Sequence, residues 1–163
     1  MPHPREEVAA TVERYVRLRR EIDAGQHGDA PWTKIADFFT DDVVYIDPAW
    51  GRVEGIDALK AFLDESMRGL EDWKFPVEYT AIEGDTVVIK WTQITPGTGP
   101  RGEELRQSGY STLLYAGNGK FSYEEDLLNM THVLEDLAAS GWRPQPGFKA
   151  PPEHPDRDWS RPG

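Results

Sequence analysis

Length, composition and charge already restrict what this chain can be. It has 163 residues, of which 38% are hydrophobic and 29% charged, and this balance indicates one folded domain with a single sizeable core. The formal net charge of −11 argues against nucleic acid and anionic membranes as partners, because phosphate binding requires clustered Lys and Arg. Cysteine is absent, which excludes disulfides, thiolate catalysis and cysteine-based metal centres.

The sequence shows no recognisable targeting or membrane-spanning segment. The stretch MPHPREEVAATVERYV lacks an apolar core of signal-peptide length, and no later segment has enough consecutive apolar residues to span a bilayer. We therefore expect a cytoplasmic protein.

Two helices are predicted near the N-terminus. The first covers residues 4–24, where apolar side chains recur at helical spacing and an acidic pair in the first turn suits the helix dipole. Its apolar stripe consists of Val8, Val12, Tyr15 and Ile22. The sequence GQHGDAP ends this helix, and a second, short helix is expected with Asp29 as its cap and Pro31 near its first turn. The apolar side of this second helix consists of Trp32, Ile35, Phe38 and Phe39.

The stretch DVVYID predicts a strand over residues 43–47. A period of two places Val43, Tyr45 and Asp47 on one face and the intervening residues on the other. The stretch GRVEG is expected to turn the chain into a third helix, IDALKAFLDESM.

A run of strands is predicted next. Their approximate ranges are 73–81, 85–94, 105–116 and 120–128. EGD and AGNGK are read as tight hairpin turns, and a last helix is expected over residues 129–140. The order of helix, helix, strand, helix and a run of strands is typical of an α+β fold, with helices on one face of a curved, mostly antiparallel sheet.

The chain is expected to divide into a domain of residues 1–141 and a C-terminal tail of residues 142–163. The tail is rich in proline and polar residues. Such a composition predicts an extended or disordered segment unless Phe148 and Trp159 pack against the domain.

Several stretches resemble the nuclear transport factor 2-like, or SnoaL-like, superfamily over about residues 5–128. They are VERYV in the first helix, FFTDDVVYIDP followed by GRVEGIDALKAFL, and the final hairpin LYAGNGKFSYEEDLL. The resemblance implies that the curved sheet wraps around the N-terminal helices as a cone with an internal pocket, a cystatin-like α+β barrel. The same scaffold hosts isomerases, cyclases, dehydratases, epoxide hydrolases and binding modules, so the resemblance specifies the fold better than the activity.

Ketosteroid isomerases give the closest local match within this superfamily. The resemblance places their general-base aspartate at Asp47 and their oxyanion-binding tyrosine at Tyr15. Their third catalytic group, a neutral aspartic acid, corresponds to Ser111, whose hydroxyl donates a weaker hydrogen bond to an enolate. SnoaL-like polyketide cyclases resemble the chain at the last strand, where their acid/base aspartate corresponds to Asp126.

Limonene-epoxide hydrolases differ from this chain on a central strand. They carry an arginine and a second aspartate at the positions of Trp91 and Gln93, so the resemblance disfavours epoxide hydrolysis. Further residues expected at the pocket wall or rim are Tyr45, Trp50, Trp91, Leu113 and Tyr115.

Each candidate site residue also has an ordinary structural interpretation. Asp47 can open a turn, but its shared face with Tyr45 places it in the cone, where desolvation raises the pKa of a carboxyl. Tyr15 is either a core tyrosine with a local partner or a donor to an oxyanion. Glu124 and Asp126 share one face of the last strand and reach the pocket only if that face is the inner one.

We expect the cone to bind a small, largely apolar organic molecule and to perform cofactor-independent acid/base chemistry of isomerase or lyase type. Isomerisation, cyclisation or dehydration through an enolate would use Asp47 as the base, Tyr15 as the donor to the enolate oxygen and Asp126 to return the proton. The alternative is a non-catalytic ligand-binding or protein-interaction domain.

The four histidines lack metal-ligand spacing, so no metal is expected. The superfamily resemblance also implies a homodimer formed through the exposed sheet face. The residues expected there are Val44, Ile46 and Val88.

Overall fold

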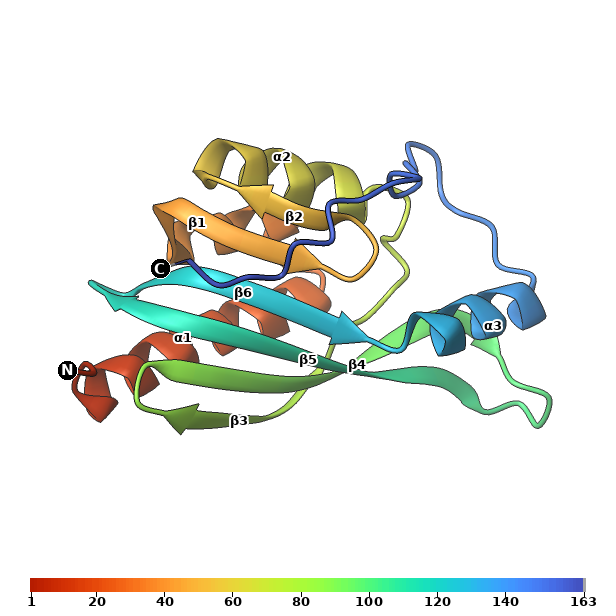
Figure 1. The fold of residues 1–163 in the computed structure, drawn as a ribbon. Helices are drawn as coiled ribbons and strands as arrows, with labels where there is room; N and C mark the ends of the chain where they lie inside the picture. Colours follow the sequence, from red (N-terminus) through yellow and green to blue (C-terminus); the bar gives the residue numbers. More distant parts are fainter. Residues whose placement is uncertain (163) are drawn as a thin grey trace.

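The structure, a computed structural model, describes residues 1–162 and has an α+β fold (Figure 1). Its strands are β1 (Phe39–Asp47), β2 (Gly51–Glu54), β3 (Val77–Glu83), β4 (Thr86–Thr98), β5 (Glu104–Gly117) and β6 (Lys120–Leu128). They form one six-stranded sheet in the order β2-β1-β6-β5-β4-β3. β1 and β6 are parallel, and the other neighbouring pairs are antiparallel.

The helices lie against one face of this sheet (Figure 1). α1 (Arg5–Asp23), the 3-10 helix η1 (Pro31–Phe38) and α2 (Ile56–Met67) cover its concave side, whereas α3 (Met130–Ser140) contacts β4 and β5 at their far end. The sheet is curved but not closed, because β2 and β3 remain as its two edges. The predicted α+β cone is therefore confirmed, without the closure that a complete barrel would require.

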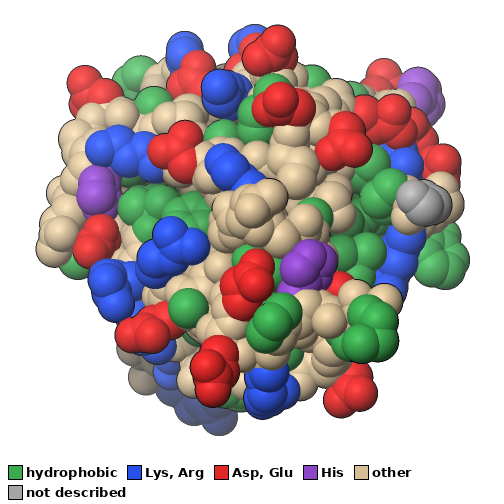
Figure 2. Space-filling model, turned by 90° about the vertical axis from the view of Figure 1, so that its left-hand side faces the viewer, with side chains coloured by type: hydrophobic (Ala, Val, Ile, Leu, Met, Phe, Trp, Pro, Cys, Tyr) green, Lys and Arg blue, Asp and Glu red, His purple; other side chains and the backbone are tan. Residues whose placement is uncertain are grey.

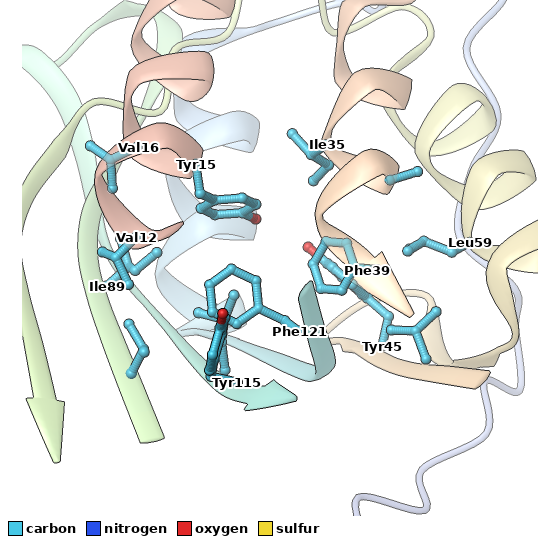
Figure 3. Close-up of a cluster of buried hydrophobic side chains, with 14 of the residues drawn as sticks. Val12, Tyr15, Val16, Ile35, Phe39, Tyr45, Leu59, Ile89, Tyr115 and Phe121 are labelled. Atoms are coloured by element: carbon cyan, nitrogen blue, oxygen red, sulfur yellow. The ribbon is translucent and has the colours of Figure 1, made fainter. Parts of the chain in front are cut away.

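α1 buries the stripe that its sequence predicts. The four apolar residues of that stripe are at most 5% exposed. Arg19 lies on the same stripe and is also only 5% exposed, although it carries a charge. Figure 3 shows Tyr15 of α1 and Tyr45 of β1 with their hydroxyls directed toward one another, beside Phe39 and Phe121. The core thus brings two buried tyrosine hydroxyls together at its centre.

Two short elements differ from the sequence-based expectation. GRVE forms β2, antiparallel to β1, because Gly51 adopts a φ of +83° that lets the chain reverse after Asp47. The second helix is a 3-10 helix, and Asp29 does not cap it: Ala30 occupies the cap position in the left-handed conformation. Phe39, expected on this helix, begins β1 instead.

The C-terminal tail, residues 142–162, has no helix or strand and follows the surface of the domain. The main-chain N–H of Arg52 donates a hydrogen bond to the carbonyl of Asp156 (2.9 Å), which pairs the tail with the edge strand β2. The Arg52 guanidinium donates to the carbonyls of Asp158 (3.2 Å) and Ser160 (2.7 Å). The tail is extended and attached at several points. Of the two residues expected to decide whether it packs, Phe148 packs beside Trp142, whereas Trp159 is 72% exposed.

The tail also crosses the outer face of β1 and β6 (Figure 1). The Arg161 guanidinium lies 5.8 Å from the centre of the Tyr123 ring. Val44 and Ile46 are buried with Tyr123 in a small cluster on this face. Two of the three residues expected at a dimer interface are thus already buried within one chain, and Val88 is half-buried. The homodimer stays a prediction.

Acidic and basic side chains are interspersed over the end of the molecule shown in Figure 2.

None of the helices within residues 1–162 is long and apolar enough to cross a membrane.

Candidate functional site

A cavity of about 280 Å³ lies between the sheet, the helices and the first part of the C-terminal tail. This volume is close to the lower end of small-molecule pockets, roughly 300–1,000 Å³. Its aromatic wall includes Trp32, Trp50, Phe62, Trp73, Phe75 and Trp91. Its hydroxyl and carboxyl groups come from Tyr15, Tyr45, Asp47, Ser66, Ser111, Glu124 and Asp126. An apolar cavity with a few polar groups has the composition expected of a ligand site.

Asp47 lies at the end of β1, where the chain turns toward β2. Its Oδ1 accepts hydrogen bonds from the main-chain N–H groups of Ala49 (2.8 Å) and Trp50 (2.7 Å). Oδ2 receives neither of these bonds, and the residue lines the cavity. Asp47 therefore opens a turn and also presents a carboxyl to the cavity, so its two sequence-based interpretations hold together.

Burial changes the acidity of this carboxyl. Desolvation raises the pKa of Asp47 to about 6, the backbone hydrogen bond from Trp50 opposes the rise, and the nearby charge of Asp126 adds to it. A carboxyl with this pKa is ionised at neutral pH but is a stronger base than an ordinary aspartate.

Asp126 and Glu124 project from β6 into the same cavity. Tyr45 donates its hydroxyl hydrogen bond to Asp126 Oδ2 (2.6 Å), and Ser111 donates to Asp126 Oδ1 (2.5 Å). Trp91 Nε1 in turn donates to Ser111 Oγ (2.9 Å). Both oxygens of Asp126 are thus held by hydroxyl donors, which fix the orientation of the carboxyl.

Glu124 is the most enclosed carboxyl of the site, at 1% exposure. It accepts a hydrogen bond at Oε2 from the Tyr15 hydroxyl (2.9 Å). Desolvation and the neighbouring Asp126 charge raise the pKa of Glu124 well above its usual value. The same burial, together with the Glu124 charge, raises the pKa of Tyr15. Burial therefore favours the protonated form of both groups, the Glu124 carboxyl and the Tyr15 hydroxyl.

The inner face of β6 is the one that carries Glu124 and Asp126, so the structure brings most of the predicted site residues into one cavity. Leu113 and Tyr115 are the exceptions, and we correct their placement. Both share the inner face of β5 with Ser111, but they lie further along the strand, where α1 closes the cone. Leu113 is fully buried core, and the Tyr115 hydroxyl donates to Glu7 (2.6 Å).

The cavity also contains residues that the sequence interpretation missed. Arg19 lines it from α1, and its position was detectable because it continues the spacing of the buried stripe between Tyr15 and Ile22. Trp142 and Phe148 line it from the tail, and their rings are 5.9 Å apart. The sequence indicated only that Phe148 could pack against the domain. That either tail residue reaches the cavity is not visible in the local sequence, because the cavity is built from segments far away in the chain.

Among residues 1–162, no cluster of three or more His, Asp or Glu side chains has the arrangement of a metal site. The polar groups of the cavity are instead bonded to one another, as carboxyl–hydroxyl pairs. Such pairs can bind and transfer protons.

The chain matches the SnoaL-like domain family over residues 9–123, and it belongs to this family. No curated protein matches the chain.

Solved structures with the same fold include enzymes of polyketide chemistry. A protein described as a SnoaL-like polyketide cyclase from Jannaschia sp. CCS1 has a TM-score of 0.63 and 22% identity, covering 88% of this chain and 99% of that one. SalBIII, described as an epoxide hydrolase/cyclase-like enzyme in pyran ring formation in salinomycin, has a TM-score of 0.57 and 16% identity, covering 78% and 94%. TerC, crystallised with polyporic acid, has a TM-score of 0.56 and 16% identity, covering 77% and 95%. At these identities the similarities show the fold.

Proposed function

We propose that the protein binds a small, largely apolar organic molecule in this cavity and catalyses cofactor-independent acid/base chemistry on a carbonyl compound. The observation that carries the proposal is the placement of Asp47, with a pKa of about 6, and the hydrogen-bonded Asp126 in one aromatic-walled cavity. The reaction passes through an enolate and belongs to the isomerisation, cyclisation or dehydration type. The ring-forming enzyme SalBIII and the ligand-bound TerC are compatible with this proposal.

In the first step, Asp47 accepts the proton from the carbon next to the carbonyl. Its Oδ1 is held by the turn, which leaves Oδ2 as the basic oxygen. A positioned general base of this kind contributes about 10²–10⁴-fold to a rate.

The developing enolate oxygen becomes negatively charged. It therefore needs hydrogen-bond donors that are not themselves negatively charged. Glu124, whose raised pKa favours the protonated form, takes this role in place of Tyr15, whose hydroxyl donates to Glu124 Oε2. Sequence similarity had placed Ser111 at the position of the neutral acid, whereas Ser111 donates to Asp126. Each preorganised donor to an oxyanion is worth roughly 10²–10³-fold.

Asp126 completes the cycle by relaying to the substrate the proton that Asp47 has taken up, so both carboxylates return to their starting state. Its two oxygens contact the hydroxyls of Tyr45 and Ser111, so a proton on Asp126 can be held or passed within this network. The charge of Asp126 also raises the pKa of Asp47, and this strengthens Asp47 as the base.

The test is proton exchange at the α-carbon of probe ketones. Deuterium incorporation into 2-tetralone and 1-indanone in D₂O would be followed by NMR with the wild type, Asp47→Asn and the surface control Tyr110→Phe. We expect the wild type and the control to accelerate exchange, and Asp47→Asn to lose about 10²–10⁴-fold of that acceleration. Exchange at the buffer rate with all three proteins would refute the enolate chemistry.

A non-catalytic ligand-binding domain is the second candidate. It is favoured by the hydrogen bonds that already occupy Asp126 at both oxygens and Asp47 at one. Saturable binding of 2-tetralone without any exchange would support this function over the first.

A further inference from the structure

Arg19 is a buried cation on the cavity wall that none of the proton-transfer steps uses. It projects from α1 and is 5% exposed. Its guanidinium lies between two indole rings, 5.8 Å from the centre of Trp32 and 5.6 Å from the centre of Trp91. Its Nε is buried and has no hydrogen-bond partner among residues 1–162.

The acidic groups around Arg19 already have other partners. The carboxylate of Asp23, one helical turn further along α1, accepts hydrogen bonds from the main-chain N–H of Phe75 (both 3.1 Å). Glu124 receives the Tyr15 hydroxyl. None of the ion pairs among residues 1–162 joins Arg19 to either carboxyl, although the charge of Arg19 opposes the rise in the pKa of both. Arg52 shows the contrast, because its guanidinium contacts Glu54 and two tail carbonyls.

Burying a guanidinium without a hydrogen-bonding partner is costly, and stacking on indole rings recovers only part of that cost. Two further hydrogen-bond donors in the cavity wall also lack a partner. The indole N–H groups of Trp73 and Trp142 are buried without an acceptor among residues 1–162. The cavity wall therefore contains several donors without a protein partner, and the Arg19 guanidinium is the charged one among them.

We propose that Arg19 binds an anionic oxygen on a planar aromatic ligand. This inference rests on the proposed ligand-binding function of the cavity and names the chemical class of the ligand: an aromatic compound with a carboxylate or an ionised enol. The guanidinium supplies a planar pair of donors to the anionic oxygen, and the rings of Trp32 and Trp91 keep it in place. Aromatic side chains of the wall then stack on the ligand's ring system.

The experiment uses a matched pair of probes, 2-naphthoate and its neutral isostere 2-naphthamide. Binding of each probe to the full-length protein would be measured by titration calorimetry at pH 6, where 2-naphthoate is ionised. The variants are Arg19→Met, which keeps an unbranched apolar stem and removes the charge, and Arg14→Met as the matched control. Arg14 lies on the same helix, is exposed and contacts Phe38 rather than the cavity.

We expect the wild type and Arg14→Met to bind 2-naphthoate roughly 10- to 100-fold more tightly than 2-naphthamide, the range for a hydrogen bond to a charged group. Arg19→Met should lose this preference and keep its affinity for 2-naphthamide. If Arg19→Met does not fold, Arg19→Lys answers the same question, since a lysine keeps the charge but not the planar donor pair and should retain only a weaker preference.

Equal affinities of the wild type for both probes, or an unchanged preference in Arg19→Met, would overturn the assignment of Arg19. The proposed function can fail separately. A wild type that prefers 2-naphthoate but does not exchange ketone protons would support Arg19 as an anion-binding residue and refute the enolate chemistry. A wild type that binds neither probe would overturn the inference and count against a ligand site in this cavity.

Discussion

Asp47→Asn tests the burial of the proposed base without any knowledge of the substrate. Asn is nearly isosteric, and its side-chain oxygen can accept the same two main-chain hydrogen bonds that Oδ1 accepts in the wild type. The substitution therefore removes the charge while it keeps the turn. Any pH-dependent change in stability then reports the cost of burying the ionised carboxyl.

The magnitude follows from the change in acidity on folding. The pKa of Asp47 rises from 3.8 to about 6, mainly by desolvation. Between these values the folded protein binds more protons than the unfolded chain, so the free energy of unfolding falls as the pH rises. A shift of about two units corresponds to about 3 kcal/mol, which is an upper value because Asp47 is half-buried. We expect Asp47→Asn to match the wild type near pH 4 and to be about 1–3 kcal/mol more stable at pH 8.

The assay is urea denaturation at pH values from 4 to 8, with the urea dependence compared between variants to confirm a common two-state transition. Asp85→Asn provides a control of opposite sign. Partial desolvation raises the pKa of Asp85, but hydrogen bonds from His3 outweigh it and hold the pKa below the ordinary value. That variant should be less stable than the wild type at neutral pH. A stability difference for Asp47→Asn that does not vary with pH would refute the buried base.

Three further predictions concern the core, the tail and a turn. Glu124→Gln should change the stability at pH 7 by less than about 1 kcal/mol in urea denaturation, because burial favours the protonated acid, which an amide replaces without a change of charge. Glu124→Ala should instead cost about 2–4 kcal/mol by leaving a cavity and an unpaired Tyr15 hydroxyl. Arg52→Ala removes two hydrogen bonds to the tail, so trypsin should cleave the tail faster in this variant than in the wild type. An unchanged cleavage rate would contradict the attachment of the tail by Arg52. Gly51→Ala should lower the melting temperature more than Gly102→Ala, because both have a positive φ but only at Gly51 would a Cβ lie 2.5 Å from a tail carbonyl oxygen.

Much of the fold could be predicted because its information is local. The stripe of α1, the whole of α2 and the last hairpin all depend on periodicity and turn residues. The spacing of two in DVVYID likewise places Tyr45 and Asp47 on the inner face, where the structure has them.

The missed features depend on contacts between distant segments. β2 was read as a turn because a four-residue strand has little periodicity of its own, and its pairing with β1 and the tail stabilises it. Leu113 and Tyr115 were placed in the pocket by their shared face with Ser111, but how deep each lies depends on where α1 closes the cone.

The amino-acid sequence by itself therefore determined the α+β class, the inner face of β1 and the identity of the acidic groups, because residue spacing encodes which side chains share a face. Tertiary structure alone decided that Glu124 pairs with Tyr15 and Asp126 with Tyr45, and that Arg19 is buried between two tryptophans. These properties arise from desolvation and from the approach of side chains far apart in the chain, and neither is visible until the elements are packed.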